Sequence, residues 1–264
     1  MRTVGTSIYL GIDPTVGRAQ FVYAALDEDG KIEALGSGKL NAVLAYAAGQ
    51  SQAWIAVNGP RGVNQGLTDA ANAQQALFNE PGNAAWNNLR LAEAELIARG
   101  LESTRTAATP EQCSPWMRTA FELYRQLARL GYQPLTDTSI ARGLIEVQAN
   151  AAFGSLAAAS LFEARALEGR LQRQLILNIE GLPLRDPMDF FEEITRHRLL
   201  KGILPFDMVY PSHELNALVA AHTLWLARQQ PQRVLTLGDA QEGQLWLPIP
   251  EPPEKPERMA YGDD

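Results

Sequence analysis

The chain has 264 residues, of which 46% are apolar, and its 23 basic and 30 acidic residues give a formal net charge of −7. This length can bury a full core, and the acidic balance excludes a broad, non-specific nucleic-acid coat, which needs clustered Lys and Arg. The single cysteine, Cys113, excludes an internal disulfide, and one cysteine with three histidines excludes a structural zinc site.

The N-terminal part of the chain predicts the edge of a mixed sheet. Residues 5–13 form a short apolar run, which indicates a buried strand, and Asp29-Gly30 is a strong hairpin signal. The expected elements are strands at 5–13, 20–27 and 31–38, a helix at 40–50 and a strand at 53–57. Hairpins followed by a helix and a further strand are typical of a mixed sheet in an α/β domain.

The rest of the chain predicts a long insertion and a series of helices. Residues 59–85 are rich in Gly, Asn and Gln, which is typical of a long loop. After it we expect helices at 87–99 and 115–130, a strand at 143–148, helices at 151–160, 162–177, 187–200 and 213–229, and strands at 233–237 and 244–248. We therefore predict one domain over 1–249, with an insertion around 59–85 and a helical segment at 160–205. The Pro- and charge-rich tail over 250–264 is predicted to be disordered.

The sequence gives no sign of a membrane segment. No stretch approaches the ~18 consecutive apolar residues that a membrane span needs. The first residues also lack the apolar run and the cleavage site of a signal peptide. We therefore expect no membrane partner and a cytoplasmic location.

Several polar side chains fall at the ends of the expected core elements. They are Asp13 and Asn58 at strand ends, Glu146 in a later strand, and His213, Glu214 and Asn216 at the start of the last long helix. Strand ends at one edge of an α/β sheet converge on the crevice where ligands bind. Carboxylates gathered there suit Mg²⁺, and two such ions about 3.5–4 Å apart can activate water against a phosphodiester. We therefore expect a site for a divalent cation at this edge of the sheet.

A series of short motifs occurs in one order along the chain: Gly11-Ile12-Asp13, Trp54-Ile55-Ala56-Val57-Asn58-Gly59-Pro60, Leu89-Arg90-Leu91-Ala92-Glu93, Trp116-Met117, Ile145-Glu146-Val147 with Ala151-Ala152-Phe153, Glu168-Gly169-Arg170, Glu214-Leu215-Asn216-Ala217-Leu218-Val219-Ala220-Ala221, and Leu237-Gly238-Asp239 through Glu242-Gly243. The ordered series resembles the family named domain of unknown function 429, whose members are regarded as predicted nucleases of the RNase H-like superfamily. The resemblance runs to about residue 248. It implies an RNase H-like fold, with a mixed central sheet flanked by helices and with helical insertions. It also implies a site for Mg²⁺ or Mn²⁺ at Asp13 and Glu146.

The chain departs from the family pattern at this site. Asn58 and Asn216 stand where the family commonly has Asp, and Gln148-Ala149 replaces the Tyr-Pro that usually follows the Glu. Each exchange of Asp for Asn removes one negative charge, which takes the site from about −4 to about −2, and charge count tunes divalent affinity. The resemblance therefore implies one weakly held cation at Asp13 and Glu146 rather than a tightly held pair.

Four further residues receive roles from the resemblance. His213 lies one helical turn before Asn216 on the same face, near the point where Holliday-junction resolvases of the superfamily place His or Asp. His213 is thus a candidate metal ligand or proton shuttle, and Glu214 restores one charge if it turns inward. Arg90 is three residues from Glu93, so an ion pair is the simplest account. The resemblance also makes Arg90 and Arg18 candidate substrate contacts.

Three functional interpretations remain open. The first is metal-dependent phosphodiester hydrolysis, with nucleic acid as the partner. The second is an inactive family member that binds nucleic acid, a nucleotide or a protein, which the two amides and the acidic balance favour. The third is an ATP-using relative of the actin-like kinases, but residues 14–18 match their phosphate hairpins poorly. Structural accounts also stand for single residues, because Asp13 and Asn58 suit turns and Asn216 can bond to backbone.

Overall fold

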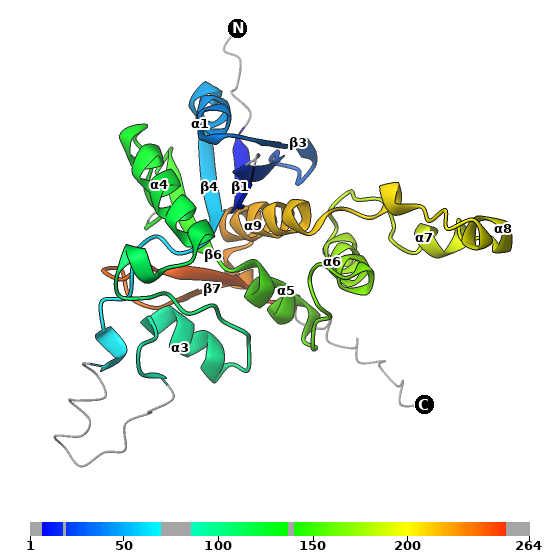
Figure 1. Cartoon of the computed structure of the whole chain (residues 1–264). Coiled ribbons are helices and arrows are strands. Elements are labelled where there is room, and N and C mark those ends of the chain that lie inside the picture. Colours follow the sequence, from blue (N-terminus) through cyan, green and yellow to red (C-terminus); the bar gives the residue numbers. More distant parts are fainter. Residues whose placement is uncertain (1–6, 18–19, 70–85, 137–139, 252–264) are drawn as a thin grey trace, which may run out of the picture.

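The computed structural model describes residues 7–17, 20–69, 86–136 and 140–251. In this described part the strands form one eight-stranded sheet in the order β3-β2-β1-β4-β6-β8-β7, with β5 paired to β6 (Figure 1). The strands are β1 Ile8–Pro14, β2 Phe21–Leu26, β3 Ile32–Gly38, β4 Ala53–Asn58, β5 Gln133–Pro134, β6 Gly143–Val147, β7 Val234–Leu237 and β8 Leu245–Pro248. The α-helices are α1 Leu40–Gly49, α3 Leu91–Ala98, α4 Pro115–Arg129, α5 Ala149–Ala157, α6 Leu167–Ile179, α7 Asp189–Glu192, α8 Arg196–Leu200 and α9 Ser212–Gln229.

The sheet is mixed, which confirms the expected α/β class. Strands β1, β2 and β3 form an antiparallel meander. The turn between β2 and β3 is closed by Asp27 Oδ1, which accepts hydrogen bonds from the backbone N–H groups of Asp29 and Lys31, while Gly30 takes a φ of 77°. Strands β1, β4, β6 and β8 are parallel to one another, and β7 is antiparallel to β8. The C-terminal ends of β1, β4 and β6 therefore lie at the same edge.

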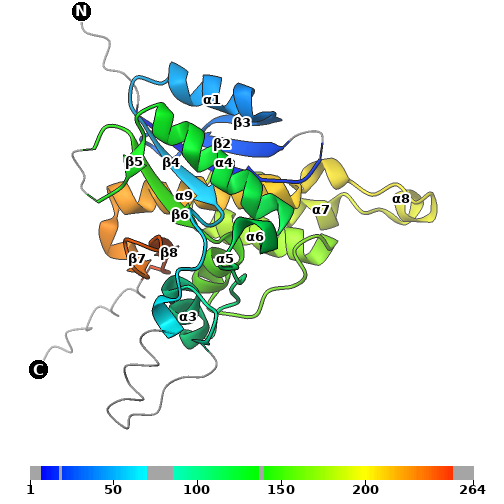
Figure 2. The same cartoon turned by 60° about the vertical axis from the view of Figure 1, so that its left-hand side comes forward.

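Helices cover both faces of the sheet (Figure 2). Alternate residues of β1 divide between them: Leu10 and Ile12 pack with α1 and α4, whereas Tyr9 packs in the core of α5, α6 and α9. Gly11 also faces α9, and a Cβ built there would lie 2.0 Å from the carbonyl oxygen of Ala217. Only glycine allows this approach, so α9 rests directly on the backbone of β1.

Two predicted helices are shorter or divided. The helix predicted at 162–177 begins only at Leu167, because Glu163 Oε2 accepts hydrogen bonds from the N–H groups of Arg165 and Ala166 and holds a turn instead. The helix predicted at 187–200 is divided into α7 and α8, because Thr195 caps a new helix by accepting from the N–H of Arg198. This segment extends away from the rest of the chain (Figures 1 and 2).

Two predictions concern segments that lie largely outside the described residues. The insertion predicted around 59–85 includes residues 70–85, and the tail predicted over 250–264 includes residues 252–264. Within the described ranges, no helix is both long enough and apolar enough to cross a bilayer.

Candidate functional site

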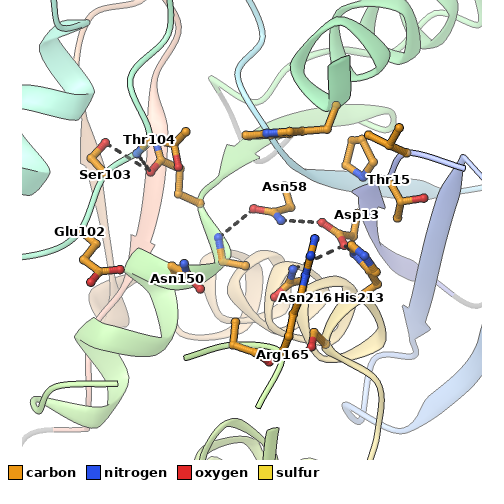
Figure 3. Close-up of a pocket in the computed structure, with 17 residues that line it drawn as sticks. Asp13, Thr15, Asn58, Glu102, Ser103, Thr104, Asn150, Arg165, His213 and Asn216 are labelled. Atoms are coloured by element: carbon orange, nitrogen blue, oxygen red, sulfur yellow. Dashed lines mark hydrogen bonds and ion pairs between the residues drawn. The ribbon is translucent and has the colours of Figure 1, made fainter. Parts of the chain in front are cut away.

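A cavity of about 420 Å³ lies at the C-terminal ends of β1, β4 and β6 (Figure 3). Asp13 and Asn58 form its floor, and residues from the first turns of α4, α5 and α9 form part of its wall. The position agrees with the general rule that ligands of open α/β sheets bind beyond the carboxyl ends of the strands.

Asp13 is the centre of the polar contacts in this cavity, and its residue is only 2% exposed. It points toward α9 because Ile12, its neighbour in the strand, points to the opposite face. Its Oδ1 accepts a hydrogen bond of 2.6 Å from Asn58 Nδ2, and its Oδ2 contacts His213 Nδ1 at 2.6 Å. Asn216 Nδ2 donates a longer bond of 3.4 Å to the same Oδ2. Three donors thus surround a single buried carboxylate.

The orientation of Asn58 is fixed by the start of α5. The backbone N–H of Ala149, in the first turn of that helix, donates to Asn58 Oδ1 at 2.8 Å. This N–H has no partner inside the helix, so Asn58 satisfies a group that helix geometry leaves free. The amide nitrogen, rather than the amide oxygen, must therefore face Asp13.

The contact between Asp13 and His213 changes how both groups bind protons. Burial raises the pKa of Asp13, and the hydrogen bonds from His213 and Asn58 oppose that rise. The hydrogen bond to Asp13 raises the pKa of His213 above its ordinary value of 6.5. Because Asn58 and Asn216 both donate N–H groups to the Asp13 carboxylate, we favour an ionised carboxylate that accepts a further hydrogen bond from a protonated Nδ1 of His213.

The expectation that Asp13 and Glu146 meet is wrong. Glu146 pairs in register with Val57, which points into the core of α1 and α4, whereas Asp13 and Asn58 point to the α9 face. Successive residues of a strand alternate between faces, so a shift of one residue places the two carboxylates on opposite sides of the sheet. The sequence correctly predicted that both residues lie in core strands, but it did not predict that their side chains point to opposite faces of the sheet.

Glu146 is held instead in a buried ion pair with Arg90. Arg90 Nη1 lies 2.7 Å from Glu146 Oε1, and Nη2 lies 3.0 Å from Oε2. The backbone N–H of Arg61 donates to the same carboxylate, and Arg90 Nη2 also donates to the carbonyls of Glu242 and Gly243. Arg90 is fully buried, so its predicted contact with substrate is wrong.

The other predicted residues are placed as follows. The expected side-chain pair of Arg90 and Glu93 does not form, because Glu93 accepts from the backbone N–H of Arg90 and from Thr106. Glu214 lines a different hollow beside Arg170, away from Asp13. Arg18 lies outside the described residues.

Sequence reasoning missed several residues that line the cavity. They are Ser103 and Thr104 before α4, Asn150 in α5, and Arg165 in the turn before α6. None belongs to a recognisable motif, and the segments that carry them approach Asp13 only through the tertiary fold. Glu163 is a local signal that could have indicated the position of Arg165. Its carboxylate accepts hydrogen bonds from the backbone of the next residues and so fixes the turn that carries Arg165.

The residues around Asp13 offer few oxygen ligands to a divalent cation. Such a cation needs oxygen ligands, but Asn58 and Asn216 both present N–H groups to the carboxylate. Turning Asn58 over would leave the N–H of Ala149 without its acceptor. Glu146, the second predicted ligand, is on the other face and already neutralised by Arg90.

Comparisons with protein-family models, with curated proteins and with solved structures find no match for this chain.

Replacing Glu146 should affect stability strongly. In Glu146→Gln the buried guanidinium of Arg90 loses its counter-charge, and we expect the free energy of unfolding to fall by about 3 kcal/mol or more. The matched control is Glu193→Gln, which breaks the partly exposed pair with Arg198 and should cost less than about 1 kcal/mol. Urea unfolding measures both. Equal stability of Glu146→Gln and the unmodified chain would contradict the structural role.

The pKa of His213 should depend on Asp13. The chain has three histidines, so each imidazole can be followed by NMR and assigned by its loss in a single substitution. We expect the pKa of His213 to lie above 6.5 and to fall toward that value in Asp13→Asn, because the carboxylate no longer stabilises the imidazolium. The pKa of His222, which burial lowers, should stay unchanged. An unchanged pKa for His213 would contradict the pairing.

Proposed function

We propose that the chain is an RNase H-like hydrolase of phosphodiesters, related to the domain of unknown function 429 family, in which His213 transfers the proton and Asp13 positions it. The single observation that carries the proposal is the 2.6 Å contact between Asp13 and His213 at the floor of the cavity. A buried carboxylate that holds one nitrogen of an imidazole leaves the other nitrogen available to a substrate.

The strand order supports the RNase H-like part of the proposal. An antiparallel meander of three strands is followed by parallel strands added beside β1. This arrangement is compatible with the mixed central sheet that the resemblance implies. The candidate site also lies at the end of β1, where the family resemblance puts its first acidic residue.

The charge around the cavity favours an anionic substrate. The first turns of α4, α5 and α9 contribute Trp116, Asn150 and His213 to the lining, and helix N-termini carry partial positive charge. The imidazolium of His213 adds a full charge whenever it is protonated. The overall charge of −7 does not oppose this, because the local field near a bound phosphate is set by the groups that line the site.

His213 can act as the general base for the attacking water. Because Asp13 occupies Nδ1, the Nε2 of the neutral imidazole accepts a proton from a water molecule whose oxygen attacks phosphorus. The bond between phosphorus and the leaving oxygen then breaks, that oxygen takes a proton from solvent, and the imidazolium releases its own proton to solvent. Asp13 keeps the ring oriented and stabilises its charged form. Mg²⁺ or Mn²⁺ stays a prediction from the resemblance, and no step above is assigned to it.

A second candidate function is binding without hydrolysis. The observation that favours it is that Asn58 and Asn216, which replace two expected carboxylates, turn N–H groups toward Asp13. A site of this kind can hold a nucleotide or nucleic acid through its cavity without cleaving it.

Hydrolysis should depend on His213 and on pH. We expect cleavage of bis(p-nitrophenyl) phosphate or of a DNA or RNA oligonucleotide to fall by about 10²–10⁴-fold in His213→Gln, the usual effect of losing a general base. The rate should decrease as the pH falls through the pKa of His213, since the imidazolium cannot accept a proton. The acidic limb should lie above 6.5, because Asp13 raises that pKa.

The control for this assay is His197→Gln, which replaces an exposed histidine in α8 and should keep full activity. Each protein is assayed with Mn²⁺ and with a chelator, so that a cation requirement appears as a difference between the two conditions. If the unmodified chain cleaves no substrate faster than His213→Gln under either condition, the hydrolase proposal fails. Retained oligonucleotide binding in that case would establish the second candidate.

A further inference from the structure

Arg165 is an exposed cation in the wall of the same cavity. Its side chain lies among the labelled residues beside His213 and Asn216 in Figure 3. Asp13 raises the pKa of His213, and the charge of Arg165 partly opposes that rise, which is the expected effect of one cation close to another. Among the residues that the structure describes, the guanidinium group of Arg165 makes no hydrogen bond or ion pair with another side chain. Arg165 and a protonated His213 therefore place two positive charges near each other. Asp13 contacts His213 and compensates its charge, but it does not contact Arg165.

The backbone that carries Arg165 is held in place from three sides. Glu163 Oε2 accepts from the N–H of Arg165 at 2.9 Å, which fixes the turn. Ser212 Oγ donates a hydrogen bond of 2.7 Å to the carbonyl of Ala164, which ties the turn to the first residue of α9. Arg173 Nη1 donates to the carbonyl of Phe162 at 3.0 Å. The turn is thus fixed beside His213, while the long side chain of Arg165 stays free to adjust.

We propose that Arg165 binds the phosphate group of the substrate, with His213 beside the same phosphate. This inference rests on the proposed function and names the residue that recognises the anion. A guanidinium can donate two parallel hydrogen bonds to phosphate oxygens, which suits it to this role. A bound phosphate also relieves the repulsion between Arg165 and the imidazolium.

The distribution of charge sets the direction in which the substrate lies. Glu102, Ser103 and Thr104 line the part of the cavity away from Arg165 (Figure 3). The carboxylate of Glu102 repels a phosphate from that end, while the two hydroxyls and the carboxylate can accept hydrogen bonds from a sugar or a base. The phosphate therefore lies at the end formed by Arg165 and His213, and the nucleoside part extends toward Ser103.

The test is the binding of inorganic phosphate to the full chain, measured by calorimetry. We expect Arg165→Gln to weaken binding by about tenfold or more, the usual effect of losing a charge-assisted contact. Arg165→Lys should lose less phosphate affinity, because lysine keeps the positive charge although it cannot donate two parallel hydrogen bonds. The matched control is Arg196→Gln, which removes an exposed arginine at the start of α8 and should leave phosphate affinity unchanged.

The outcomes separate this inference from the hydrolase proposal. The role of Arg165 is overturned if Arg165→Gln and the unmodified chain bind phosphate equally well. It is also overturned if the unmodified chain binds no phosphate at millimolar concentrations. Phosphate binding that depends on Arg165, in a chain that cleaves nothing, supports the inference and removes only the hydrolase proposal. Cleavage that depends on His213 but keeps its KM in Arg165→Gln supports hydrolysis and overturns the role of Arg165.

Discussion

The close packing of α9 on β1 is the constraint on which the candidate site depends. A Cβ at Gly11 would lie 2.0 Å from the carbonyl oxygen of Ala217 and 2.4 Å from the backbone nitrogen of Ala221, so the helix touches the strand backbone there. With α9 at this distance, His213 in its first turn reaches Asp13 at the end of the same strand. A larger residue at position 11 would have to move the helix, and the contact between the two side chains would move with it.

The two faces of the sheet use carboxylates for different purposes. Glu146 is matched by Arg90 in a bidentate pair; the backbone N–H of Arg61 also donates to Glu146, and the carbonyl of Gly243 accepts from Arg90. Such a pair specifies how the segments around it assemble, and it offers nothing to a ligand. Asp13 is paired with His213, whose imidazole is about half exposed, so this pair extends from the buried floor of the cavity to its solvent-exposed side. Two carboxylates that are almost equally buried therefore differ in how close they lie to solvent.

Much of the fold could be predicted from the sequence, because strand periodicity and turn chemistry are local. The β-hairpin at Asp29-Gly30 and the helix after Pro211 are examples. The strand positions of Asp13, Asn58 and Glu146 were also predicted, but the face that each occupies follows from pairing register, which is set by distant segments. Arg165 was missed for the same reason, since it reaches the cavity only through the turn that Glu163 and Ser212 hold in place.

The central claim is that Asp13 and His213 act as one coupled unit, and a double-mutant cycle measures that coupling most directly. The free energies of unfolding of the unmodified chain, Asp13→Asn, His213→Gln and the double variant are compared at a pH below about 6.5, where the imidazole is charged. The account predicts a coupling energy of about 1 kcal/mol or more that decreases as the pH rises through the pKa of His213. Additive effects of the two substitutions at every pH would contradict it.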